Sequence, residues 1–121
     1  MMSAVQDRLV EESLSGSWLS SRLGVGTQRL DAMRRAGELL GVRRAGRQDH
    51  LYPAWQFGPD GRPLPAIERI VQAARGAGLT DERLYEVLTS RVGISGRETL
   101  VDALREGRVQ YVLDSVRGTR A

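Results

Sequence analysis

Residues 17–37, SWLSSRLGVGTQRLDAMRRAG, contain the pattern that decides our prediction of the fold. Three apolar residues recur there at helical spacing; they are Trp18, Leu19 and Leu23. Gly24 follows them, and glycine commonly ends a helix in the left-handed conformation. Thr27 is a typical N-cap for a second helix, which Gly37 ends. Two short helices joined by the tight turn Gly-Val-Gly predict a helix-turn-helix.

A basic hairpin is predicted directly after these helices. LLGVRR, residues 39–44, runs from apolar to basic as a strand would, and HLYP, residues 50–53, is a returning strand that proline ends. The segment between them contains a glycine and is predicted to form the turn. We expect Arg43 or Arg44 on the outward side of this hairpin and Arg47 at its tip. Two helices followed by a hairpin are the order of a winged helix-turn-helix.

The second half of the chain is predicted to be a small helical lobe. Three of the four prolines fall in residues 59–65, so we place a boundary there and expect residues 1–62 and 63–121 as the two lobes. Residues 1–16 are expected to form a lead helix or arm. Four helical patterns follow the boundary, with a loop at 94–98; they are 64–78, 81–93, 99–107 and 108–118. Thr80 is the expected cap of the second helix, and Thr99 and Asp102 have the spacing of a capping box at the start of the third. The predicted fold class is mainly α with a small β-hairpin.

Composition argues against several function classes. The chain has no cysteine and one histidine, His50, and no phosphate-binding glycine loop or catalytic grouping occurs. We therefore expect no metal, no cofactor, no catalytic residue and no enzyme activity. No run of about 18 apolar residues and no signal-peptide pattern occurs, so a cytoplasmic protein without a membrane contact is expected, located at the nucleoid when bound to DNA.

The positive charge gathers in one segment. Every one of the eighteen basic residues is an arginine, which a GC-rich genome also explains. Residues 17–57 hold seven arginines against three acidic residues, a net charge of +4, whereas residues 1–16 carry −2 and residues 58–121 carry +1. A local basic face is typical of a protein that binds a polyanion.

The second helix of the pattern carries the residues that we expect to contact DNA. If Leu30 and Met33 pack inward, the exposed side carries Gln28, Asp31, Ala32 and Arg35. Arg29 and Arg34 are then expected on the flanks of this side. Glutamine can pair with adenine, arginine with guanine, and a central alanine allows close approach to a thymine methyl. The predicted DNA-binding residues are Thr27, Gln28, Arg29, Asp31, Ala32, Arg34 and Arg35 on the helix, and Arg43, Arg44 and Arg47 on the hairpin. The alternative is an ordinary solvated helix beside a charged sheet edge.

Three aromatic residues lie at the end of the hairpin and directly after it: Tyr52, Trp55 and Phe57. Exposed rings can stack on nucleic-acid bases, whereas buried rings would fix the hairpin against the helices. Their position between the hairpin and the proline-rich boundary favours the buried role.

Two stretches resemble a known family. Residues 39–67 are similar to the junction of small bacterial helix-turn-helix proteins with a YPxWQF…DGRPLP motif. Residues 96–118 resemble the closing motif of the Xre/MbcA/ParS toxin-binding domain, with Leu100 where that family usually has proline. The matching positions are Gly96, Asp102, Leu104, Gly107, Val109 and Val112. RLYEVLTSRVGISG also lacks the prolines that the family shows there.

The resemblance implies an antitoxin whose N-terminal part binds operator DNA and whose C-terminal lobe neutralises a RES-type toxin. The residues themselves favour a sequence-specific binder of double-stranded DNA, a transcriptional regulator. A third hypothesis assigns the C-terminal helices only to dimerisation, since regulators of this class commonly bind paired half-sites as homodimers.

Overall fold

The computed structural model of the protein describes residues 4–92 and 96–119. The chain divides into two compact units, residues 1–68 and 69–121, and the division falls inside helix α4. The structure is mainly helical with a small three-stranded antiparallel sheet. This confirms the coarse fold class predicted from the sequence.

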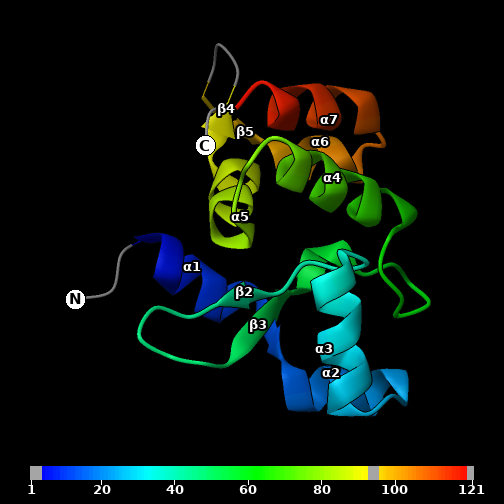
Figure 1. Ribbon diagram of the computed structural model, residues 1–121. Coiled ribbons are helices and arrows are strands. Elements are labelled where there is room, and N and C mark those ends of the chain that lie inside the picture. The colour runs from blue at the N-terminus through cyan, green and yellow to red at the C-terminus, as the bar shows by residue number, and fades with distance from the viewer. Residues whose placement is uncertain (1–3, 93–95, 120–121) are drawn as a thin grey trace. The chain divides into compact units, whose positions relative to one another are not determined.

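The N-terminal unit contains both helices and short strands (Figure 1). In chain order its elements are α1 (Ala4–Glu12), β1 (Ser13–Ser15), α2 (Gly16–Leu23), α3 (Thr27–Ala36), β2 (Val42–Arg43), β3 (His50–Pro53) and the 3-10 turn η1 (Ala54–Gln56).

A third strand joins the predicted hairpin to form the sheet. The strand order is β1-β3-β2, with Leu14 opposite Tyr52 and Val42 opposite Leu51. The lead segment 1–16 is therefore not only a helix or arm, because its last residues before α2 pair with the sheet; residues 1–3 lie outside the described part. Two serines around one leucine carry little intrinsic strand preference, so this strand exists because β3 supplies its hydrogen-bond partners.

The turn between α2 and α3 has the predicted geometry. Gly24 has a φ of +70°, and its N–H donates to the carbonyl oxygens of the last turn of α2. The Ser20 hydroxyl donates to the Val25 carbonyl oxygen, and the Val25 N–H donates to the Ser20 carbonyl oxygen at 3.1 Å. The prediction that Thr27 caps α3 is wrong, because Gly26 occupies the cap position and Thr27 is the first helical residue.

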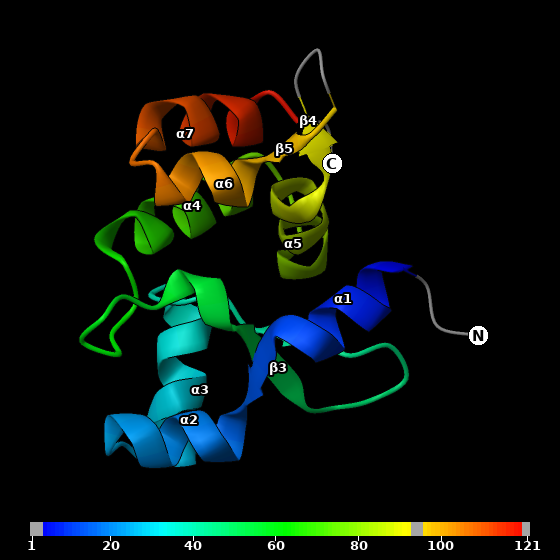
Figure 2. The ribbon, with the colours of Figure 1, turned by 180° about the vertical axis from the view of Figure 1, so that it is seen from behind.

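Helices α2 and α3 cross in both views (Figures 1 and 2), and they pack through a small core. Leu19, Leu30, Leu39 and Tyr52 form this cluster of buried side chains. Trp18 was expected on the apolar stripe of α2 but is 53% exposed. Adjacent helical residues point about 100° apart, and Leu19 takes the buried direction.

The C-terminal unit is built on helices with one short ladder. Its elements are α4 (Pro65–Gly76), of which residues 65–68 belong to the N-terminal unit, α5 (Asp81–Thr89), β4 (Arg91–Val92), β5 (Glu98–Thr99), α6 (Leu100–Arg105) and α7 (Val109–Arg117). The loop predicted for 94–98 is partly wrong, because Glu98 pairs with Val92; residues 94 and 95 lie outside the described part. None of the helices in the described ranges is long and apolar enough to cross a membrane.

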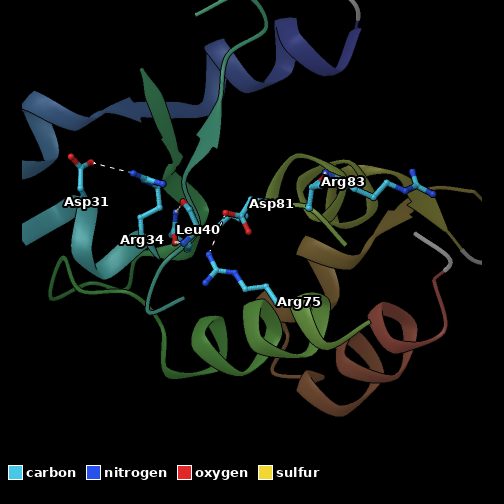
Figure 3. A network of polar contacts seen from close by, with 8 residues as sticks. Asp31, Arg34, Leu40, Arg75, Asp81 and Arg83 are labelled. Carbon is cyan, nitrogen blue, oxygen red and sulfur yellow. Dashed lines mark hydrogen bonds and ion pairs between the residues drawn. The ribbon is translucent and has the colours of Figure 1, made fainter. Parts of the chain in front are cut away.

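The predicted helix caps of this unit are present. Thr80 accepts a hydrogen bond from the Arg83 N–H at 3.0 Å. Thr99 and Asp102 form the reciprocal capping box, and the backbone hydrogen bond from Thr99 lowers the pKa of Asp102. An ion pair of 3.3 Å between Arg75 and Asp81 links the end of α4 to the start of α5 (Figure 3).

Candidate nucleic-acid interface

Helix α3 presents the polar face that the sequence predicted. Leu30 is 1% exposed, and Met33 packs against the same core cluster. The residues on the other side of the helix are exposed; they are Thr27, Gln28, Arg29, Ala32 and Arg35. The surface of α3 thus combines two arginines, an amide and a small central residue, which is a composition suited to base edges in the major groove.

Arg34 does not lie on the exposed flank where the sequence pattern placed it. Its side chain is only 17% exposed, and its guanidinium lies 3.5 Å from the carboxylate of Asp31 (Figure 3). A Cβ built at Gly41 would approach Arg34 Cδ to 2.5 Å and Tyr52 Cε1 to 2.8 Å. The Arg34 side chain therefore lies in a space between α3 and the sheet that the absence of a side chain at Gly41 leaves open.

Tyr52 is the partner of Arg34 on the sheet. Burial raises the pKa of Tyr52 above its ordinary value, although hydrogen bonding to Arg34 and the charge of that residue act in the opposite direction. The phenol is therefore protonated at neutral pH. Asp31, Arg34 and Tyr52 form a polar chain from the surface of α3 to strand β3, and we call it the Asp31–Arg34–Tyr52 chain.

The hairpin between β2 and β3 carries the other predicted arginines. Arg43 and Arg47 are exposed, and the Arg47 N–H donates to the Arg44 carbonyl oxygen at 3.1 Å within the turn. Arg44 is half-buried and lies 4.0 Å from the carboxylate of Asp49. The Ala45 N–H donates to the Gln6 side chain of α1 at 3.0 Å, so the base of the turn is connected to the first helix.

A buried glutamine connects the end of the sheet to the segment after α3. Gln56 is 0% exposed. Its Oε1 accepts from the Leu40 N–H at 2.7 Å, and its Nε2 donates to the carbonyl oxygens of Leu40 and Pro53 at 2.8 and 3.1 Å. This role was not predicted for Gln56, because the signal in the sequence is only one amide between Trp55 and Phe57 in an otherwise apolar segment.

The aromatic residues after the hairpin are in the core. Tyr52 is 1% exposed and Trp55 is 7% exposed, while Phe57 is half-buried against the cluster of α2 and α3. The indole N–H of Trp55 donates to Glu12 of α1 at 3.3 Å. The prediction that these rings pack inside is confirmed for Tyr52 and Trp55, and neither ring presents a face on which bases could stack.

A groove of about 410 Å³ lies between the start of α2, helix α3 and the hairpin. It is lined by Ser15, Gly16, Ser17, Thr27, Leu30, Asp31, Arg34, Gln48, Asp49, His50 and Tyr52. His50 lies in β3 and is half-buried. In the described ranges, no three histidine, cysteine or acidic residues are close enough to hold a metal ion.

No protein-family model and no curated protein matches the chain. The similarity to Xre/MbcA/ParS proteins therefore stays a prediction. Among solved structures, the NMR structure of Rv2175c is similar, with 20% sequence identity and a TM-score of 0.72. The match covers 87% of this chain and 78% of that chain. At this identity the likeness shows a shared fold and nothing about activity.

Proposed function

We propose that the protein is a sequence-specific binder of double-stranded DNA and acts as a transcriptional regulator. The observation that carries the proposal is the exposed face of α3, which follows a tight turn and lies in the same compact unit as an arginine-bearing hairpin. The element order helix, strand, helix, helix, strand, strand, with sheet order β1-β3-β2, supports a winged helix-turn-helix. In such a unit, the second helix of the motif enters the major groove.

In this proposal, helix α3 contacts bases and the hairpin contacts phosphates. Gln28, Arg29 and Arg35 contact base edges, and Ala32 allows α3 to approach the groove floor. Arg43 and Arg47 contact phosphates, which positions the protein without selecting a sequence. Arg44 is less accessible because it lies beside Asp49. Two copies would bind paired half-sites as a homodimer.

DNA affinity is expected to fall steeply with salt. If the hairpin and α3 contact about four to six phosphates, counterion release gives a slope of log affinity against log salt near −4 to −5. Fluorescence anisotropy with a labelled duplex, repeated over a series of salt concentrations, measures this slope. An affinity that does not change with salt contradicts the proposal.

Substitutions in α3 and in the hairpin are expected to differ in kind. Gln28→Ala or Arg35→Ala should weaken binding to the preferred sequence by about 1 to 3 kcal/mol and relax selectivity. Arg47→Ala should weaken binding to every sequence alike, because a phosphate contact is independent of the base. The matched control is Arg117→Ala, which removes an exposed arginine of α7 in the other unit. This variant should leave DNA binding unchanged. Equal losses on all sequences from all three test variants would contradict the role of α3.

A further inference from the structure

Asp31 is the acidic residue among the polar and basic side chains that we place against DNA. It belongs to α3, one turn from both Gln28 and Arg35, and its side chain is 51% exposed. A carboxylate at a surface that approaches phosphates is repelled by them, so its presence there weakens general affinity for DNA. A carboxylate that weakens general affinity can still contribute to a DNA-binding surface if it accepts a hydrogen bond from a particular base and so makes binding selective.

The structure keeps Asp31 in a defined position. The Arg34 guanidinium lies 3.5 Å from Asp31 Oδ1 (Figure 3). The Arg34 side chain is itself confined beside the buried Tyr52. The charge of Arg34 reduces the repulsion between Asp31 and phosphates. One cation at one oxygen leaves further acceptor capacity on the carboxylate, since an ionised carboxylate accepts about four hydrogen bonds.

Base chemistry selects the partner of such a carboxylate. In the major groove, cytosine presents its N4 amino group as a donor, whereas guanine presents the acceptors N7 and O6 and thymine presents the acceptor O4. Adenine presents a donor at N6 next to an acceptor at N7, which repels a second carboxylate oxygen. A carboxylate therefore favours cytosine over the other three bases.

We infer that Asp31 selects a cytosine by accepting a hydrogen bond from its N4 amino group, and that Arg34 and Tyr52 are the positioning residues that orient it. This inference rests on the proposed function, in which α3 lies in the major groove. It identifies one base pair of the recognition site by chemistry, and it gives the inward-lying Arg34 a role other than phosphate contact.

Selection of preferred sequences from a randomised duplex library by the full-length protein tests this inference. The unaltered protein should select cytosine at one position of its site. Asp31→Asn should change that preference to adenine, because an asparagine amide pairs with N6 and N7, and the ratio of affinities for cytosine and adenine should fall roughly tenfold or more. Asp31→Ala should accept the four bases nearly equally there. All other positions should keep their preferences.

Two further variants separate base selection from charge and from folding. Asp49→Asn also removes an acidic side chain at the groove, but on the hairpin, so it should strengthen binding to all sequences alike and leave the cytosine preference unchanged. Tyr52→Phe keeps the buried ring and removes the hydroxyl that is hydrogen-bonded to Arg34. It should weaken the cytosine preference less than Asp31→Asn does, without affecting other positions.

The outcomes distinguish this inference from the proposed function. If Asp31→Asn and Asp31→Ala bind DNA with the base preferences of the unaltered protein, Asp31 does not select a base and the inference is overturned, while DNA binding stands. The same holds if the unaltered protein binds DNA without selecting cytosine anywhere. If the unaltered protein binds no duplex even at low salt, both the proposed function and the inference fail.

Discussion

Replacing Gln56 with alanine is expected to lower the free energy of unfolding of the N-terminal unit by about 3 to 5 kcal/mol. The substitution leaves the Leu40 N–H and the carbonyl oxygens of Leu40 and Pro53 without their hydrogen-bond partner in the interior. Each unsatisfied buried group costs about 1 to 3 kcal/mol, and the removed side chain leaves a cavity. The hydrogen bonds that are lost are those that connect the segment after α3 to the end of the sheet.

Urea unfolding followed by tryptophan fluorescence measures this loss in the relevant unit. The chain has two tryptophans, Trp18 and Trp55, and both lie in the N-terminal unit, so their emission reports its unfolding. Gln48→Ala is the matched control, since the same side chain is exposed there on the hairpin and its removal should cost less than about 0.5 kcal/mol. A loss below about 1 kcal/mol for Gln56→Ala would show that the three backbone groups find other partners.

Leu30→Ala is expected to cost about 3 kcal/mol of unfolding free energy, within the usual range for a buried leucine. Leu30 is 1% exposed and is the fully buried residue of α3 in the cluster with Leu19, Leu39 and Tyr52, against which Met33 also packs. The cavity would lie under the helix whose outer face we assign to DNA. A variant that remains folded at low temperature should therefore also bind its preferred sequence less tightly, because α3 is less firmly positioned.

Leu14→Ala is the matched comparison for this substitution. Leu14 packs against the same cluster from strand β1 but is only partly buried, so its truncation should cost less. Equal losses for the two variants in the same urea experiment would contradict the view that burial of Leu30 is the main attachment of α3.

Local signals in the sequence were sufficient to predict a structural feature where one short segment contains all the residues that interact in it. Gly24 ends α2 in the left-handed conformation, and Thr99 and Asp102 form a capping box three residues apart. The inward packing of Leu30 follows from helical periodicity alone. Each of these features depends on residues within one or two helical turns, so pattern and propensity are enough to predict it.

The candidate interface was predictable in part for the same reason. Helical periodicity correctly places Gln28, Ala32 and Arg35 on the exposed side of α3. The same periodicity places Arg34 on an exposed flank, but its side chain is only 17% exposed. A long arginine side chain adopts the direction in which its neighbours leave space. That space is set by Gly41 and Tyr52, which lie elsewhere in the chain. Trp18 was misplaced similarly, because an apolar residue beside a helix stripe packs inward only if the core has room for it.

Periodicity, turn residues and charge in the sequence thus account for helices α2 and α3 with the tight turn between them, the arginine-bearing hairpin and the exposed face of α3. The packing of distant segments determines strand β1, which depends on pairing with β3. The same packing determines the burial of Gln56, whose side chain makes two hydrogen bonds to the backbone of Leu40. It also determines the inward direction of Arg34 toward Tyr52. The reason is physical: hydrogen bonds and contacts between residues far apart in the chain leave little trace in local propensity, and they form only when the fold brings those residues together.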